Sequence, residues 1–207
     1  MLHLLLCTRP KLKGTLFQKD LGSIYDKNLR VEALTPALAE AMGFSAAKET
    51  AAAAAALCKA DLATSTVTEM TALAGTMGRH YATKQGLPED VATAVFEAVL
   101  PRQAGDILPA TPAGIVVAVA DRLDSLVGLV AAVGAPSATA DPYGLRRAAY
   151  GMLQVRLCHG WMRMGWQSSF VALALAAAGE VSMWVGIRVW LQSRLPAAIT
   201  ALQQGNL

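Results

Sequence analysis

The sequence is poor in charged and aromatic residues, which make up 16% and 6% of its 207 residues, whereas 54% are hydrophobic. An intrinsically disordered chain needs low hydrophobicity and high net charge, so this composition excludes one. A domain usually takes roughly 100–200 residues, and we therefore expect one domain with at most an appendage.

Cysteine and histidine are scarce as well, with three of each. Cys7, Cys58 and Cys158 lie far apart, and the sequence contains no Cys-x-x-Cys pair. An odd number of distant cysteines supports neither a disulfide framework nor a zinc module. We expect reduced thiols that are mostly buried.

Several motifs of catalysis and nucleotide binding are missing. The sequence has no Gly-x-Ser-x-Gly elbow and no reactive-cysteine signature, so we interpret His80 as an ordinary helix histidine rather than a member of a hydrolase triad. The segment Gly75–Gly78 has neither the Walker spacing nor the dinucleotide fingerprint. The sequence therefore predicts no ATP site on this chain.

Helical periodicity dominates what the sequence does contain. Much of the hydrophobic content is alanine, the best helix former, with spaced Leu, Val and Met and no alternating β-branched runs. Val31, Leu34, Leu38 and Met42 recur at three- and four-residue steps before Gly43, which marks a helix end. We predict an all-α fold without strands, with helices at 27–42, 46–59, 61–82 (interrupted near Gly75 and Gly78), 88–100, 113–130 and from 141 onward.

Two compositions meet near Gln154. Residues 1–150 hold 14 Lys and Arg and 14 Asp and Glu, whereas residues 151–207 hold four Arg, a single Glu and all four Trp. We therefore expect a helical domain at 12–154 and an atypical apolar helical tail at 155–207 of uncertain origin. Residues 1–10 are doubtful for the same reason.

Within the tail, Phe170–Leu191 is long enough to span a bilayer, with 22 residues. Its nine Leu, Ile, Val and Phe residues contribute roughly −4 kcal/mol to insertion, and Glu180 near the centre costs about 2.5–3.5 kcal/mol. The sum is close to zero, and we expect no membrane partner. Met1–Cys7 lacks a basic region and a cleavage site, so no targeting segment is readable.

Two acids and two arginines are the main candidates for chemistry. Asp121 and Asp124 are three residues apart and share a helix face, where they would bind a metal or transfer protons. Without a partner histidine, we favour one buried, hydrogen-bonded Asp and one solvated Asp near Arg122. Arg146 and Arg147 lie near a helix start, where arginines neutralise phosphates or form a solvated face.

Six segments in order resemble the beta subunit of the bacterial-type heterotetrameric glycyl-tRNA synthetase, over about Leu12–Gln154. They are Phe17–Ser23 with Lys27 and Arg30, Lys59–Thr64, Gly75–Ala82, Leu100–Asp106, Ala120–Gly128 and Asp141–Gly151.

The resemblance implies an HD-like helical bundle without metal chemistry. A true HD phosphohydrolase binds metal through a His-Asp doublet, further histidines and a later Asp. Here the doublet position reads Ala60-Asp61, and Asp121 resembles the final Asp. Alanine has no donor atom, so we expect relic, structural roles for Asp61 and Asp121 and no catalytic or metal site. The alternative is a metal-dependent HD-type phosphohydrolase that uses Asp61, Asp121 and His80.

The resemblance also implies a role in the ATP-dependent attachment of glycine to tRNA(Gly), in which this fragment is not active alone. The implied partners are tRNA(Gly), the alpha subunit and the remainder of the beta subunit. ATP and Mg belong to the whole enzyme, and the fragment binds no cofactor. Arg79, Arg102, Arg146 and Arg147 match family positions and are the candidates for tRNA contact. The family works in the bacterial cytoplasm and in chloroplasts or mitochondria.

Overall fold

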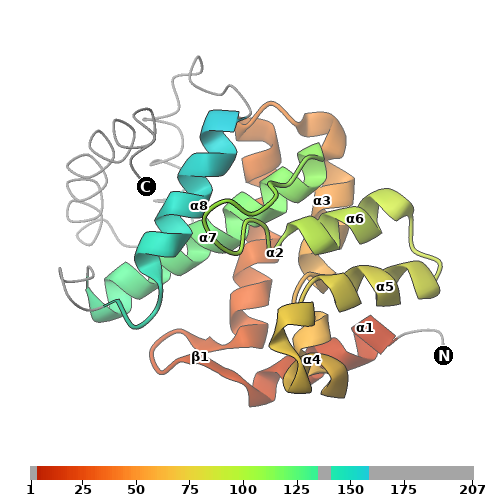
Figure 1. The fold of residues 1–207 in the computed structure, drawn as a ribbon, viewed down its shortest axis with the longest axis horizontal. Helices are drawn as coiled ribbons and strands as arrows, with labels where there is room; N and C mark the ends of the chain where they lie inside the picture. The colour runs from red at the N-terminus through yellow and green to blue at the C-terminus, as the bar shows by residue number, and fades with distance from the viewer. Residues whose placement is uncertain (1–3, 135–140, 159–207) are drawn as a thin grey trace.

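The computed structural model describes residues 4–134 and 141–158 (Figure 1). His3, His159, the four tryptophans and the segment 170–191 lie outside the described residues. Within the described ranges, no helix is long and apolar enough to cross a membrane.

The described residues are mostly helical. The α-helices are α1 (Leu4–Thr8), α2 (Ile24–Ala41), α3 (Lys48–Leu57), α4 (Ser65–Glu69), α5 (Thr76–Lys84), α6 (Glu89–Glu97), α7 (Pro112–Val133) and α8 (Leu145–Cys158). Short 3-10 turns lie at Arg9–Gly14, Ser45–Ala47, Ala60–Ala63 and Thr71–Leu73. The helical prediction is confirmed for most of these segments.

The prediction of an all-α fold without strands is wrong in one place. Strands β1 (Leu16–Gln18) and β2 (Gly22–Ser23) form an antiparallel hairpin, with Leu16 opposite Ser23. The Gln18 side chain closes the turn by accepting hydrogen bonds from the amides of Asp20 and Leu21. Strands of three and two residues are too short to leave an alternating hydrophobic pattern.

Helix α2 forms as its periodicity predicts. Ser23 and Asp26 form a capping box at its start, which satisfies amides of the first turn. Val31, Leu34 and Leu38 are buried on one face. The helix ends before Gly43, whose φ of 76° favours glycine.

The predictions for 61–82 and for the helix from 141 onward differ from the structure in a way that its hydrogen bonds explain. The segment 61–82 is divided into α4 and α5 with short turns, and the break falls at Gly75 while Gly78 lies inside α5. Helix α8 begins at Leu145 rather than at Asp141, because the Asp141 carboxylate accepts hydrogen bonds from the Leu145 and Arg146 amides. These bonds satisfy first-turn donors of α8.

Helix α7 is the centre of the core. It packs against α2, α3, α6 and α8, and residues 113–120 are all buried (Figure 1). Helix α1 also joins the core, since Leu5 is fully buried. The predicted limit at Gln154 falls inside α8. The division into 12–154 and 155–207 stays a prediction.

Candidate functional site

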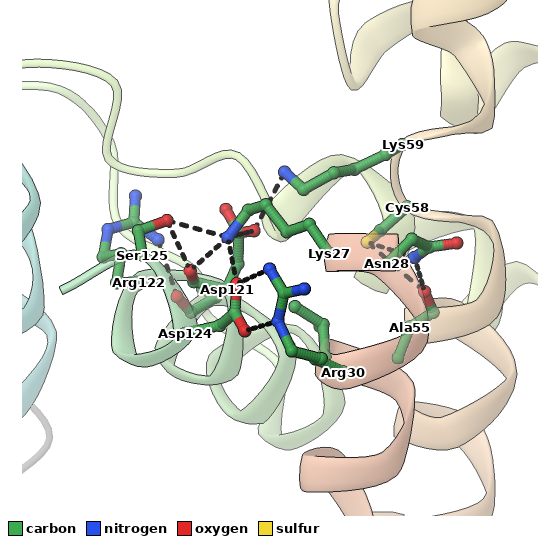
Figure 2. A network of polar contacts seen from close by, with 12 residues as sticks. Lys27, Asn28, Arg30, Ala55, Cys58, Lys59, Asp121, Arg122, Asp124 and Ser125 are labelled. Carbon is green, nitrogen blue, oxygen red and sulfur yellow. Dashed lines mark hydrogen bonds and ion pairs between the residues drawn. The ribbon is translucent and has the colours of Figure 1, made fainter. Parts of the chain in front are cut away.

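Asp121 on α7 lies between two lysines from other elements. Its Oδ1 atom is 3.0 Å from the Nζ atom of Lys27 on α2 and 3.0 Å from that of Lys59, which follows α3 (Figure 2). Lys27 also donates to the Asp121 carbonyl at 2.9 Å and to the Ser125 hydroxyl at 2.7 Å. The lysines tie α7 to both neighbouring helices.

Asp124 lies one turn further along the same face of α7. Its carboxylate is bound by Arg30 through Nε at 2.6 Å and by Lys27 at 3.1 Å. Arg30 also donates to the Leu21 carbonyl at 3.0 Å, which links the hairpin to α2. The expectation of a solvated Asp near Arg122 is therefore wrong: Lys27 and Arg30 lie three residues apart on α2 and face the acid pair.

The Asp121 carboxylate and the ammonium groups of Lys27 and Lys59 keep one another ionised. Burial is the strongest influence on Asp121 and acts to raise its pKa, yet the Lys27 and Lys59 ammonium groups together hold that pKa well below its usual range. Burial acts to lower the pKa of Lys59, but the Asp121 carboxylate raises it above the ordinary value. The acid and the lysine are therefore both ionised at neutral pH.

Arg122 and Cys58 complete the surroundings of the network. Arg122 donates to the carbonyls of Ala118 at 2.8 Å and Pro101 at 2.8 Å, so it holds the loop after α6 rather than an acid.

The Cys58 thiol is buried, and burial raises its pKa to about 12. The expectation of mostly buried thiols is confirmed for Cys58, whereas Cys7 is exposed and the side chain of Cys158 lies outside the described residues.

Asp61 faces a different group of donors. Its Oδ2 atom accepts hydrogen bonds from the amides of Gly75 at 2.7 Å and Gly78 at 3.1 Å, at the start of α5. Its side chain is 1% exposed, and burial raises its pKa, opposed by those amides. Asp61 thus acts as a distant N-cap for α5.

The structure does not assemble the metal site of the alternative hypothesis. His80 lies exposed on α5 with its ring edge against Tyr81. Asp61 binds amides and Asp121 binds two ammonium groups. Among residues 4–134 and 141–158, no three His, Cys, Asp or Glu side chains are grouped to hold a metal ion. The donor set does not fit a metal, because cations of the protein already occupy the Asp121 oxygen.

The four candidate arginines lie at the surface in different settings. Arg79 on α5 pairs with Glu89 at 2.6 Å. Arg102 lies in the loop after α6, with its guanidinium 5.6 Å from the centre of the Phe96 ring. These side chains are exposed, and each already has a partner within the fold.

Arg146 and Arg147 lie exposed in the first turn of α8. Helix α8 lies to the left of α5 and α6 in Figure 1, and Arg79 belongs to α5. Pro101, next to Arg102 in the chain, lies close to Gly151 of α8. Arg102 thus follows a residue that contacts α8, the helix that carries Arg146 and Arg147, whereas Arg79 lies on another helix.

The sequence pattern did not predict the contact of Lys59, whose ammonium group binds Asp121. It gave no role to Ser125 and no pairing to Lys27 and Arg30. One signal was present: the three-residue spacing of Lys27 and Arg30 equals that of Asp121 and Asp124. Two helices with complementary pairs at equal spacing can place them face to face.

Comparison with known proteins decides the family. A family model described as glycyl-tRNA synthetase beta subunit matches residues 4–201. The chain belongs to this family. The glycine–tRNA ligase beta subunit of Marinobacter nauticus is 51% identical over 144 residues, which are 70% of this chain and 20% of that protein. That of Clostridioides difficile is 46% identical over 145 residues, 70% of this chain and 21% of that protein.

A further relative of this synthetase family is the chloroplastic/mitochondrial glycine–tRNA ligase 2 of Arabidopsis thaliana. It is 47% identical over 148 residues, which are 71% of this chain and 14% of that protein. The chain thus spans about a fifth or less of the length of these relatives.

Proposed function

We propose that this chain is a non-catalytic, HD-like helical part of a glycyl-tRNA synthetase beta subunit, which supports glycylation of tRNA(Gly). The observation that carries the non-catalytic role is the Asp121 carboxylate, held by the ammonium groups of Lys27 and Lys59. An acid neutralised in this way is not available as a metal ligand or a proton acceptor. Its role is to join α2, α3 and α7.

The partners follow from the family. The chain covers a small part of the relatives, so the remainder of the beta subunit and the alpha subunit would supply the rest of the enzyme, including its use of ATP and Mg. We expect no catalytic residue in this part of the chain. The named relatives come from bacteria and from a plant protein described as chloroplastic/mitochondrial, and we propose the same compartments, the cytoplasm of bacteria or an organelle, for this chain.

The contact with tRNA is proposed for the first turn of α8. Arg146 and Arg147 are adjacent and exposed, and arginine matches phosphate geometry with two parallel hydrogen bonds. Tyr143 is 44% exposed in the turn before the helix and offers a ring for stacking. Arg102 would extend this surface, while Arg79 would contact a separate part of the tRNA.

The test replaces Arg146 and Arg147 by Ala in a complete beta subunit bound to its alpha subunit. Each lost phosphate contact should lower tRNA affinity and reduce the salt dependence of binding. Lys84→Ala is the control, because Lys84 is an exposed cation on α5. Unchanged affinity and an unchanged salt slope in the double variant would exclude this surface.

The phosphohydrolase alternative has a separate test. Calorimetric titration of the chain with manganese or zinc should give no saturable binding at Asp61 or Asp121, since their carboxylates bind amides and lysines. Saturable binding that Asp121→Asn removes would favour the hydrolase.

The origin of residues 155–207 is a further part of the proposal. The shift in Trp, Lys, Asp and net charge supports a separate origin, whereas the family match extends through residue 201. Peptide mapping of the natural product decides between them. Abundant peptides that join Gln154 to the tail would show that both parts belong to one protein.

A further inference from the structure

A groove opens beside the hairpin of β1 and β2, which lies at the lower left of Figure 1. Its volume of about 570 Å³ falls within the range of binding pockets, roughly 300–1,000 Å³. The lining comes from the turn before β1, the two strands and the first turn of α2: Lys13, Gly14, Leu16, Gly22, Ser23, Tyr25 and Asp26. These residues take no part in the Asp121 network or in the α8 surface.

Lys13 gives the groove a cation that lacks a counterion within the fold. Its Nζ atom lies 4.9 Å from the centre of the Tyr25 ring, and no ion pair joins it to a carboxylate of the described residues. Lys11, two residues earlier, is exposed and likewise has no ion pair within the described part of the chain. An ammonium group carries three donors, so Lys13 can bind a carboxylate from outside.

The other lining side chains are apolar or negatively charged. Leu16 is 69% exposed, more than any other large hydrophobic side chain of the described residues. Hydrogen bonds from Ser23 lower the pKa of Asp26, whose carboxylate is therefore ionised at neutral pH. A nucleic-acid backbone would be repelled by this carboxylate, whereas a polypeptide can offer an acid, an amide and an apolar side chain together. The lining thus favours a polypeptide ligand over RNA.

The groove is formed before any partner arrives. The Ser23 amide donates to the Asp26 carboxylate at 2.8 Å, which fixes β2 to the start of α2. Arg30 donates to the Leu21 carbonyl at 3.0 Å, and the Gln18 side chain closes the turn between the strands. A preformed surface loses little conformational entropy on binding.

The size of the groove indicates where its occupant comes from. Stable contacts between separate proteins bury about 1,200–2,000 Å² of surface, far more than a groove lined by seven residues provides. A segment of the same polypeptide has an effective concentration in the millimolar range, so a small contact is sufficient. The matched region is 20% of the Marinobacter nauticus subunit, so about four fifths of such a subunit is available to supply this segment.

We propose that this groove receives an extended segment of the remainder of the beta subunit, with an apolar side chain against Leu16 and a carboxylate bound to Lys13. The inference rests on the proposed function in one respect, namely that this chain is part of a larger beta subunit. It adds the surface through which the two parts meet and the chemistry of the segment that binds there.

The experiment is carbodiimide cross-linking of the complete beta subunit bound to its alpha subunit. The reagent joins an amine to a carboxylate that it already contacts, and mass spectrometry identifies the linked peptides. Lys13 should be linked to an Asp or Glu in the remainder of the beta subunit. Lys48, which pairs with Glu40, is the positive control, and Lys84, an exposed lysine on α5, gives the background. A link from Lys13 to the alpha subunit or to Asp26 alone, or no link above background while Lys48–Glu40 forms, would overturn the proposal.

Gly14 allows the groove to be filled without disturbing the fold. A Cβ atom there would meet nothing within 4 Å, and its φ lies outside the left-handed region that favours glycine. Gly14→Trp should therefore reduce the Lys13 link at least about tenfold by occupying the space of the segment, whereas Gly14→Ala should retain it. Equal links in the two variants would contradict docking in the groove. The wild-type cross-link remains a test even if Gly14→Trp fails to fold.

Adding tRNA(Gly) before the reagent tests the rival ligand. The Lys13 link should be unchanged, and its loss in the presence of tRNA would assign the groove to RNA and refute the proposal. The outcome is independent of the α8 surface. Absence of the Lys13 link, together with weakened tRNA binding by the Arg146 and Arg147 double variant, would remove the groove and leave the proposed function standing. Unchanged tRNA binding by that variant, with the Lys13 link present, would do the reverse.

Discussion

The carboxylate of Asp61 lies 2.7 Å from the amide of Gly75, a residue that adopts a φ of 77° directly before α5. The same oxygen accepts the amide of Gly78 at 3.1 Å. Side-chain acceptors at a helix start usually come from the residue next to it, but here the acceptor lies 14 residues earlier. A buried acid therefore fixes the position of α5 relative to the turn after α3.

The first prediction concerns the pH dependence of Asp61. Burial raises its pKa above the ordinary value of 3.8, so the folded chain keeps a proton that the unfolded chain releases. This contribution to stability is complete below the unfolded pKa and is lost as the pH rises through the folded pKa. We expect Asp61→Asn to remove this dependence, so that its free energy of unfolding rises relative to wild type as the pH increases above about 4.

Urea unfolding followed by circular dichroism, repeated across this pH range, measures the effect. Glu69→Gln, which removes an exposed carboxyl on α4, is the control for the loss of a carboxyl group. A difference between Asp61→Asn and wild type that does not change with pH would contradict the prediction.

The second prediction concerns Gly78. A Cβ atom there would lie 2.9 Å from Cγ1 of Val95, which is fully buried, and 3.2 Å from Asp61 Oδ2. We expect Gly78→Ala to cost about 1–3 kcal/mol of stability through overpacking, partly offset by the better helix propensity of alanine. Gly14→Ala is the matched control, because its Cβ would meet nothing within 4 Å. Thermal unfolding compares the two, and equal melting temperatures would contradict close packing at Gly78.

The sequence was sufficient for the long helices and for part of the site. Periodicity predicted the bounds of α2 and α7 to within a few residues. Helix α2 buries one wide face and α7 buries most of its surface, so both leave a clear hydrophobic pattern in the sequence. It did not show that Lys27 meets Asp121 and Asp124, since these partners are more than 90 residues apart and nothing local records a tertiary ion pair. Gly75 itself indicated a helix break in the sequence. The hydrogen bond from its amide to Asp61, 14 residues earlier, is a tertiary contact that the local pattern does not predict.

The third prediction concerns Asp121. Asp121→Asn leaves Lys27 and Lys59 buried without their shared carboxylate, and breaking a buried pair costs about 3–5 kcal/mol. Lys59→Met should cost less, because the Asp121 carboxylate keeps the Lys27 ammonium group as a partner at 3.0 Å. Urea unfolding at neutral pH tests the order of the two variants. The reverse order would show that Lys59 is needed for packing more than Asp121 is needed for charge.

The fourth prediction concerns how the free energy of unfolding depends on the ionisation of Asp121 at low pH. Its pKa is lowered in the folded state, despite burial, by the two lysines. The stability that this provides is present above the unfolded pKa of about 3.8 and is lost as the pH falls through the folded pKa. The free energy of unfolding of Asp121→Asn should therefore approach that of wild type as the solution is acidified below pH 3.8. A difference that stays constant down to the acid transition would contradict the ion pairs.

The last prediction concerns the thiols. Cys58 is buried, its thiol lies 3.4 Å from the Ala55 carbonyl, and burial raises its pKa to about 12. Because the thiolate is the reactive form, its fraction at neutral pH is roughly a thousandfold below that of an ordinary cysteine. Cys7 is exposed and should react with iodoacetamide in the native chain, whereas Cys58 should react only after denaturation. Mass spectrometry of the labelled peptides separates the two sites, and rapid native labelling of Cys58 would show that the contact between α2 and α3 opens readily in solution.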